Sequence, residues 1–422
     1  MKIGKFAQTC GVSVATIRYY ISIGMLVPND SSTQYEFSDR EVEDLRLILR
    51  MKKQNFKLKE IQDYLVLTRH SRMIEPSIID AAMQILEEKQ KEISAEIEIL
   101  KESYQEITEE IKQLGASQGS RRRELSGVPL SAVSLFCCPY CGRSLRVEDA
   151  VIQNGYLMSG VLSCPEGGDE AAEYQISIDN GIIKTGNLYQ GAYDHPDLER
   201  GLYRDMSPDF DRGLRHSYDR ISKLLLEEDL HGKVILEANI NGYFYMYNHL
   251  NLLPSDCTLI VIDKYPEMLE MYKELIEQCN PQCQILYIAD AGTSYPLREG
   301  CVDLYISYLG ENEYLLYHEH TYLEDAGRFL KKNAKIYGAF ISYDKRAESR
   351  KKLRKKYPES SPRLYQMDYL REEYQKNGYL LEPKEMSVVS DSGTKEYAFE
   401  CHLKGENLWV YSFIARPTKD AR

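Results

Sequence analysis

Four of the ten cysteines lie close together in the sequence, at positions 137, 138, 141 and 164. Residues 136–142 read Phe-Cys-Cys-Pro-Tyr-Cys-Gly, which contains a Cys-x-x-Cys turn followed by glycine. Two thiolates of one such turn suit two corners of a tetrahedral zinc site. Cys164 offers a third thiolate, while Gly167 stands where a second Cys-x-x-Cys pair would end. We therefore predict a metal site at Cys138, Cys141 and Cys164, with Cys137 as the candidate fourth ligand.

Three interpretations of these cysteines stay open. The first is a bound structural zinc ion, the second is a vestigial ribbon without metal, and the third is a redox-active pair. A redox pair is disfavoured because no thioredoxin-like strand and helix surround the motif. A disulfide framework is not expected in a large chain that we predict to be cytoplasmic. The segment resembles the small zinc ribbon that precedes the catalytic domain in some ribosomal RNA guanine methyltransferases.

Acidic residues stand at the ends of apolar runs in the second half of the chain. Glu237 ends the run 233–237, Asp263 ends the run 259–263, and Asp290 lies near the end of the run 284–291. These runs alternate with helical patterns, which predicts a doubly wound α/β sheet with a ligand at the carboxyl ends of its strands. Further elements are predicted as a helix over 267–277, a strand over 302–307, a helix over 322–331 and a strand over 334–342.

This order of elements resembles the class I S-adenosylmethionine-dependent methyltransferases. The resemblance implies that Asp263 holds the ribose hydroxyls of the cofactor and that Asp290 and Ala291 border its adenine. Residues 296–304 match the link that leads into the fourth strand of the family. Glu237 and Gly242 stand at the two ends of the first loop, which implies contacts with the cofactor there. The implied cofactor is S-adenosylmethionine.

The first loop departs from the family pattern. The family has a glycine-rich turn that lets the backbone approach the methionine end of the cofactor, whereas residues 237–244 read Glu-Ala-Asn-Ile-Asn-Gly-Tyr-Phe. Side chains at Ala238 and Ile240 oppose such an approach. The base-methylating signature Asn-Pro-Pro-Tyr is also missing after the fourth strand, at 308–312. We interpret the domain as a sensor or a degenerate enzyme, and a purely structural relic remains an alternative.

The N-terminus carries a helix-turn-helix pattern. A short helix over 5–9 is followed by the turn 11–13 and by a second helix over 14–23, for which Ser13 is a good N-cap. The second helix carries Thr16, Arg18 and Tyr19 within one turn. Arginine and tyrosine side chains near a helix start can bind phosphate oxygens. Extended pieces at 25–28 and 35–37, a capping box at 38–41 and a helix over 58–65 complete the pattern.

These residues resemble the MerR family of winged-helix regulators. The matching motifs are Ile3-Gly4-Lys5, Gly11-Val12-Ser13, Thr16-Ile17-Arg18-Tyr19-Tyr20, Gly24-Met25-Leu26 and Phe56-Lys57-Leu58-Lys59-Glu60-Ile61. The resemblance implies a homodimer that binds pseudo-palindromic double-stranded promoter DNA through Ser13, Thr16, Arg18, Tyr19 and the wing residue Tyr35. Glu36 stands where the family has arginine, so the wing contact is expected to be weak.

A long helix with an apolar seam follows this N-terminal part. Its apolar positions alternate four and three residues apart after Ile93, with Gln90 as the one polar seam position. Such a heptad pattern predicts a coiled coil that joins two chains. The alternative is a lone amphipathic helix that packs on its own chain. The seam positions are Leu86, Ile93, Ile97, Leu100, Tyr104, Ile107, Ile111 and Leu114.

Length and charge agree with a multidomain regulator. The chain has 422 residues and a net charge of −12, but residues 1–70 hold 11 Lys and Arg against 8 Asp and Glu, which places any nucleic-acid contact at the N-terminus. No apolar run is long enough to span a bilayer and no signal peptide is apparent, so we expect a cytoplasmic protein without a membrane partner.

The predicted fold is multidomain, α plus α/β, in five parts. These are a winged-helix domain over 1–75, a dimerisation helix over 76–115, a linker over 116–134, a zinc-ribbon-like segment over 135–190 and a methyltransferase-like Rossmann domain over 191–422. The predicted function is a MerR-type transcription regulator whose C-terminal domain senses a small-molecule effector, with S-adenosylmethionine and zinc as candidate ligands. The alternative is an active methyltransferase with an autoregulatory DNA-binding domain.

Overall fold

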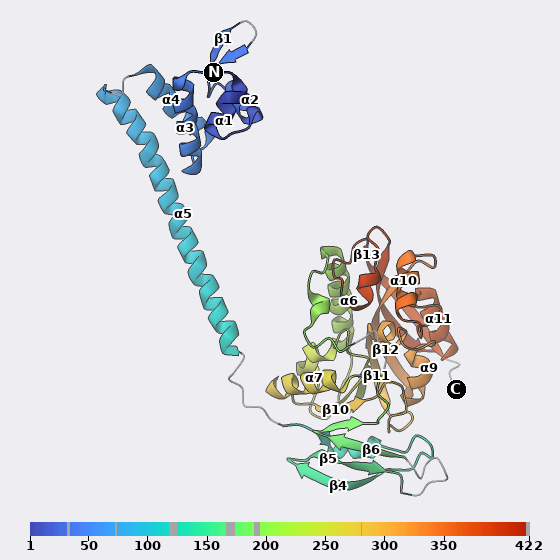
Figure 1. Cartoon of the computed structure of the whole chain (residues 1–422). Coiled ribbons are helices and arrows are strands. Elements are labelled where there is room, and N and C mark those ends of the chain that lie inside the picture. The colour runs from blue at the N-terminus through green and yellow to red at the C-terminus, as the bar shows by residue number, and fades with distance from the viewer. Residues whose placement is uncertain are drawn as a thin grey trace. The chain divides into compact units, whose positions relative to one another are not determined.

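The computed structural model describes residues 1–31, 34–71, 74–117, 125–165, 174–189, 195–279 and 281–418. The chain divides into two compact units, Met1–Ser120 and Arg121–Arg422 (Figure 1). Among the described residues, no helix is both long enough and apolar enough to cross a membrane.

The N-terminal unit begins with two short helices joined by a tight turn. α1 spans Ile3–Cys10 and α2 spans Val14–Ser22. Gly11 follows α1 at a φ of +67°, a left-handed conformation that glycine adopts without steric cost. Ser13 caps α2, because its Oγ accepts the backbone N–H of Thr16 at 3.0 Å. The predicted helix-turn-helix is therefore present.

A small wing and two further helices complete the globular part of this unit. β1 (Asn29–Ser31) pairs antiparallel with β2 (Gln34–Glu36), so the first wing strand begins after the extended piece expected at 25–28. α3 spans Asp39–Lys53 and opens with the predicted capping box, in which Glu41 Oε2 accepts the Ser38 N–H at 2.6 Å. α4 spans Leu58–His70 and so extends past the predicted end at 65.

α5 is one continuous helix over Pro76–Ser117, 42 residues long. Its N-terminal part packs on α4 through Lys89, which is 5% exposed and pairs with Glu60 at 2.9 Å. Further along, the predicted seam positions face solvent in the single chain: Ile97 is 45% exposed and Leu100 is 61% exposed. The helix is thus confirmed, and no other described element of the N-terminal unit covers the seam at these positions.

The C-terminal unit is built on one large mixed sheet. Along the sheet the strands follow the order β10, β9, β8, β11, β12, β14 and β13. The first five are parallel, and β14 runs antiparallel between β12 and β13. The order reverses between β8 and β11, which is the switch point of a doubly wound sheet. The strands span Gln284–Ala289 (β10), Thr258–Asp263 (β9), Val234–Ala238 (β8), Val302–Tyr308 (β11), Leu330–Tyr343 (β12), Leu408–Pro417 (β14) and Tyr379–Val389 (β13).

Helices accompany this sheet at the positions expected for a Rossmann-like fold. They are α6 (Pro208–Leu226), α7 (Pro266–Cys279), α8 (Gly310–Tyr314), α9 (Tyr322–Ala326), α10 (Glu348–Lys356) and α11 (Met367–Lys376). The helix predicted over 322–331 is wrong in its second half. The α-helix ends at Ala326, and Leu330 already pairs with Val302 of β11 as the first residue of β12.

The cysteine-rich segment, by which we mean residues 125–189, adds further strands to the same sheet. They are β3 (Val128–Pro129), β4 (Arg146–Gln153), β5 (Tyr156–Ser163), β6 (Gln175–Asp179) and β7 (Ile182–Lys184). β7 pairs in parallel with β10, so the segment continues the Rossmann sheet (Figure 1). Within the predicted linker over 116–134, residues 128–129 form β3 and residues 130–134 belong to a 3-10 helix over Leu130–Leu135, whereas 118–124 lie outside the described residues.

Candidate functional site

The candidate DNA-binding residues lie on the surface of the N-terminal unit. Arg18 is exposed, Tyr19 is 50% exposed and Tyr35 on β2 is 42% exposed. Ser13 Oγ contacts Thr16 Oγ1 at 2.8 Å in addition to capping α2. The contacts between Ser13 and Thr16 therefore stabilise the start of α2. Arg18 and Tyr19 are exposed on the same helix and are available to phosphate oxygens.

Three of the four predicted metal ligands lie together. The sulfur atoms of Cys138, Cys141 and Cys164 are all within 4.8 Å of one another, and Cys141 Sγ lies 3.5 Å from Cys164 Sγ. The turn is closed by hydrogen bonds from Cys138 N to Arg143 O and from Gly142 N to Cys138 O, each 2.8 Å long. A hydrogen bond from the Arg143 backbone lowers the pKa of the Cys141 thiol.

Cys137 does not belong to this cluster. Its thiol is buried and donates to the Leu297 carbonyl oxygen at 3.4 Å. Adjacent residues of an extended chain point to opposite sides, so Cys137 contacts residues 296–297 while Cys138 faces Cys141. Gly167, at the position of a missing cysteine, lies outside the described residues.

Glu237, at the end of β8, is used to shape the first loop. Its carboxylate accepts the backbone N–H of Tyr245 at 2.7 Å and that of Met246 at 2.8 Å. The side chain is 1% exposed, and burial raises the pKa of Glu237 to about 8 against the opposing effect of these two hydrogen bonds. Glu237 thus caps the segment that follows the loop.

Asp263, at the end of β9, is fully buried and bonded to its own chain. One oxygen accepts the N–H of Asn241 at 2.8 Å, and the other accepts the N–H of Tyr265 at 2.9 Å. Burial raises the pKa of Asp263 to about 7, although Lys264 and the two N–H donors oppose this shift. The acid that the family uses for ribose hydroxyls therefore holds the first loop in this structure.

Asp290, at the end of β10, is capped by the segment that follows β7. Its carboxylate accepts the Thr185 hydroxyl at 2.6 Å and the Gly292 N–H at 2.7 Å. Ala291 N donates to Asn187 O at 2.7 Å. The cysteine-rich segment therefore reaches the predicted adenine border, a contact that no sequence pattern indicated.

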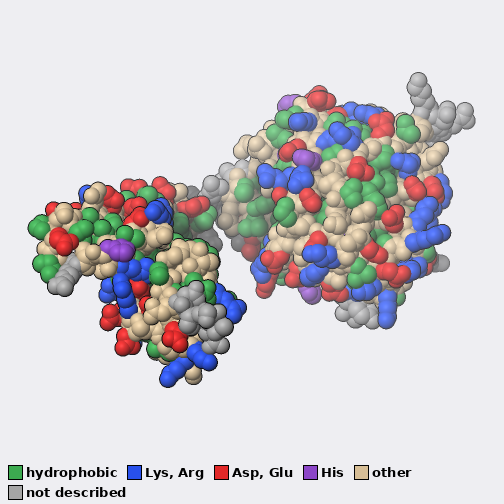
Figure 2. Space-filling view, turned by 90° about the horizontal axis from the view of Figure 1, so that it is seen from above, with side chains coloured by type: hydrophobic (Ala, Val, Ile, Leu, Met, Phe, Trp, Pro, Cys, Tyr) green, Lys and Arg blue, Asp and Glu red, His purple; other side chains and the backbone are tan. Residues whose placement is uncertain are grey.

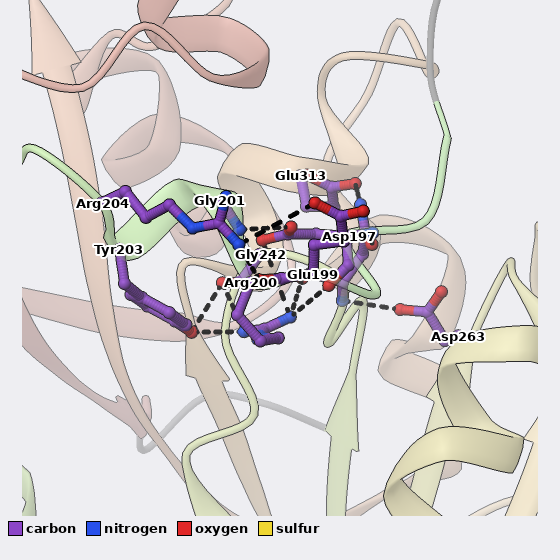
Figure 3. A network of polar contacts seen from close by, with 10 residues as sticks. Asp197, Glu199, Arg200, Gly201, Tyr203, Arg204, Gly242, Asp263 and Glu313 are labelled. Carbon is purple, nitrogen blue, oxygen red and sulfur yellow. Dashed lines mark hydrogen bonds and ion pairs between the residues drawn. The ribbon is translucent and has the colours of Figure 1, made fainter.

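Residues 197–203, which the sequence did not single out, cover the first loop, and we call them the covering segment. The N–H of Asp197 donates to Asn241 Oδ1 at 2.9 Å, and Arg200 donates to Asn241 O at 3.1 Å (Figure 3). The Tyr203 hydroxyl donates to Gly242 O at 3.1 Å. The guanidinium of Arg200 lies over the Tyr203 ring, 4.8 Å from its centroid. These contacts bond the glycine-poor first loop to residues 197–203.

A second polar pair lies beside this loop. Asn241 Nδ2 donates to Glu313 Oε1 at 3.3 Å (Figure 3). Glu313 also pairs with Lys264. The Lys264 ammonium lies 3.7 Å from the centroid of the Tyr317 ring, a cation–π contact. The loop, the end of β9 and α8 are therefore joined by one network.

Two cavities flank the covering segment. One, of about 380 Å³, is lined by Arg200, Tyr203, Tyr243, Phe244, Tyr247, Asn248, Met271, Tyr272 and Leu275. The other, of about 340 Å³, is lined by Tyr203, Met206, Asp211, Leu214, Arg215, Tyr218, Asp219, Tyr243 and Tyr308. Tyr203 and Tyr243 line both, and each volume is in the range of small-molecule sites. A further cavity of about 900 Å³ lies away from the first loop, between the end of β12 and the start of β14.

Comparison with known proteins identifies the N-terminal part. Residues 1–66 match the MerR HTH family of regulatory proteins, so this part of the chain is a MerR HTH family domain. Heavy metal-dependent transcription regulator 2 of Rhizobium meliloti and the HTH-type transcriptional regulator HmrR of Sinorhizobium medicae are each 30% identical over 97 residues, 22% of this chain. The chain spans 66% of the length of these relatives.

Solved structures are similar to parts of the chain. A MerR family transcriptional regulator from Listeria monocytogenes is 22% identical and covers 27% of this chain and 86% of its own, with a TM-score of 0.23. A SAM-dependent methyltransferase from Aquifex aeolicus is 15% identical, and the match covers 52% of this chain and 98% of the methyltransferase, with a TM-score of 0.31. Phosphoethanolamine N-methyltransferase 2 of Haemonchus contortus is 13% identical, and the match covers 47% of this chain and 53% of that enzyme, with a TM-score of 0.35. The Rossmann-like assignment of the C-terminal unit rests on its strand order.

Proposed function

We propose that this chain is a transcription regulator that binds double-stranded promoter DNA as a homodimer and senses a small molecule through its C-terminal unit. The observation that carries the DNA-binding part is the Ser13-capped helix α2, which presents Arg18 and Tyr19 to solvent within a MerR HTH family domain. Phosphate contacts of this kind position a protein on the duplex.

The exposed seam of α5 supports the dimer. Ile107, Ile111 and Leu114 are each more than half exposed in the single chain, on one side of a charged helix. Burial of such a stripe against a second copy removes apolar surface from water, at roughly 25 cal/mol per Å². We therefore propose a two-chain coiled coil along this helix.

The closed first loop supports a sensor rather than an enzyme. Methyl transfer needs donor and acceptor held at a near-attack distance, so a small displacement lowers the rate steeply, whereas binding tolerates it better. Ile240 is fully buried in this loop and both Asp263 oxygens are bonded to the backbone. We propose that an adenosine-containing ligand, or a replacement for it, binds at this edge of the sheet, with the cavities lined by Tyr203 and Tyr243 as its approach.

The competing proposal is an active S-adenosylmethionine-dependent methyltransferase that also regulates its own gene. The strand order and the acids at the ends of β8, β9 and β10 favour it. The bonding of those acids to the chain's own N–H groups and hydroxyls favours the sensor.

We also propose a structural zinc ion at Cys138, Cys141 and Cys164. Zinc–sulfur bonds of about 2.3 Å place two thiolates of a tetrahedral site roughly 3.8 Å apart. The 3.5 Å separation of Cys141 and Cys164 is close to that value. Three corners of a tetrahedron are thus supplied, and bound zinc would tie the Cys138–Cys141 turn to the end of β5.

Selection of operator DNA from a random library by the full-length protein, followed by titration of the selected duplex, tests the regulator. Arg18→Ala is expected to weaken binding at least tenfold at low salt, because a phosphate contact is lost. Lys101→Ala is the matched control, since Lys101 is an exposed cation on α5 that pairs only with its neighbour Glu98 among the described carboxylates. Equal affinity of wild type and Arg18→Ala would refute the assigned role of α2.

A further inference from the structure

One short segment of the C-terminal unit has a charge opposite to the rest of that unit. Residues 121–422 hold 37 Lys and Arg against 46 Asp and Glu, a net charge of −9. Residues 345–356, which lead into and form α10, hold eight basic side chains and only one acidic side chain, Glu348. On the face of this unit that Figure 2 shows, basic and acidic side chains are interspersed. The basic segment is therefore a local feature that the composition of the unit does not predict.

α10 is held rigidly on the unit. Leu353 is fully buried, and so is Ser349, whose Oγ accepts the N–H of Leu403 at 2.8 Å. The carboxylate of Glu406 accepts the N–H groups of Glu348 and Ser349, both at 2.8 Å, and so caps the start of the helix. These contacts fix which side of α10 faces solvent.

The solvent side of this segment carries cations without acidic partners. Arg346, Lys352, Arg354 and Lys355 are exposed, and no carboxylate of the described residues lies within 4.0 Å of their nitrogen atoms. By contrast, Lys345, Lys351 and Lys356 each pair with a carboxylate, those of Asp368, Glu348 and Glu400. We call the four unpaired side chains the α10 surface.

The α10 cations crowd one another. Burial lowers the pKa of Arg350, and the neighbouring Arg354 and Arg363 lower it further. A fixed group of like charges repels itself, and an added anion relieves this repulsion. An extended polyanion fits the surface better than a small anion, because the four cations are spread over residues 346–355 and, of these four, only Arg346 lines a described cavity.

We propose that the α10 surface binds the phosphate backbone of duplex DNA, independently of its sequence. DNA is the polyanion that the N-terminal domain is proposed to bind, and one chain carries both units, so bound DNA raises the phosphate concentration around α10. The inference goes beyond the proposed function, on which it depends only for this local concentration. Lysine and arginine on a helix are the side chains that neutralise DNA phosphates.

The test uses full-length protein and a long fluorescent duplex of random sequence, with affinity measured by anisotropy over a salt series. The variant Lys352→Ala, Arg354→Ala, Lys355→Ala removes three of the four cations. The control Lys223→Ala, Lys332→Ala, Lys384→Ala removes three exposed cations from other parts of the same unit. Each lost phosphate contact is expected to lower the slope of log affinity against log salt by roughly 0.9, so the α10 variant should lose about 2 to 3 from the slope and at least tenfold in affinity at low salt.

The same series in the Arg18→Ala background separates this inference from the proposed function. A loss caused by the α10 variant in both backgrounds, with the control unchanged, supports the α10 surface even where Arg18→Ala itself has no effect. An α10 variant that binds like the wild type overturns the inference. An equal loss in the control variant overturns it as well, because net charge alone would then explain the binding.

Discussion

The backbone N–H of Asn241 donates to Asp263 Oδ2 at 2.8 Å and thereby joins the first loop of the Rossmann sheet to the end of β9. The resemblance to methyltransferases gives this acid to the ribose of the cofactor. Here its second oxygen is also taken, by the N–H of Tyr265, and the side chain has no exposed surface. A nucleoside could reach Asp263 only if the loop moved, so the proposed ligand binding would be coupled to the position of the loop.

Asp263→Ala is expected to destabilise the C-terminal unit, because two buried N–H groups lose their acceptor. Each such loss costs about 1–3 kcal/mol in the free energy of unfolding. Asp256→Ala is the control, since Asp256 is more than half exposed and pairs only with the exposed His231 among the described basic groups, and it should change stability by roughly 0.5 kcal/mol or less. Urea unfolding measures both, and equally small effects would show that the Asp263 carboxylate is free for a ligand.

The stability of the C-terminal unit is expected to fall as pH rises. Burial raises the pKa of Glu237 from 4.5 to about 8, so between these values the folded chain holds a proton that the unfolded chain has released. Folding stability then decreases with rising pH across this window and levels off above it. Urea midpoints measured across the window should decline in the wild type, and the decline should be smaller in Glu237→Gln. A decline of equal size in that variant would assign the pH dependence to other groups.

The sequence predicted the strands of the Rossmann sheet well, because β8, β9, β10 and β11 are short apolar runs bounded by turns. It did not predict the union of the cysteine-rich segment with β10, since pairing between β7 and β10 depends on backbone hydrogen bonds that leave no side-chain pattern. The glycine-poor loop predicted from the sequence is hydrogen-bonded to Asp263 and to Arg200, whereas the altered cofactor site inferred from it stays a prediction. Asp197 and Arg200 carried no signal, because the groups through which they bond the first loop are the side-chain amide and the backbone carbonyl of Asn241, which lies more than 40 residues further along the chain.

The seam of α5 should be essential for dimer formation. Ile97→Lys with Leu100→Lys places charges in a stripe that we propose is buried between two chains, and burial of unpaired charge is costly. Light scattering should therefore give monomers for the double variant. Ile99→Lys is the control, because Ile99 is 62% exposed and lies off the seam, and this variant should remain a dimer. A stable dimer of the double variant would contradict the coiled coil.

Purified protein should contain about one zinc ion per chain when no chelator is used, as expected for a structural thiolate site. Cys141→Ser removes one of the three clustered sulfurs and should strongly reduce the zinc content. Cys279→Ser is the matched control, since Cys279 is exposed and outside the cluster, and should retain the metal. Metal-free wild-type protein in elemental analysis would favour the vestigial ribbon.

The central claim is that the methyltransferase-like unit senses a ligand and does not catalyse. Its most direct test is methyl transfer from S-adenosylmethionine with a labelled methyl group to duplex DNA, RNA and small-molecule acceptors by the full-length protein. We expect no transfer above the level of the Asp263→Asn variant, because the first loop and the acid that would hold the cofactor are bonded to each other. Robust methylation by the wild type that is lost in Asp263→Asn would contradict the claim and make this protein an enzyme.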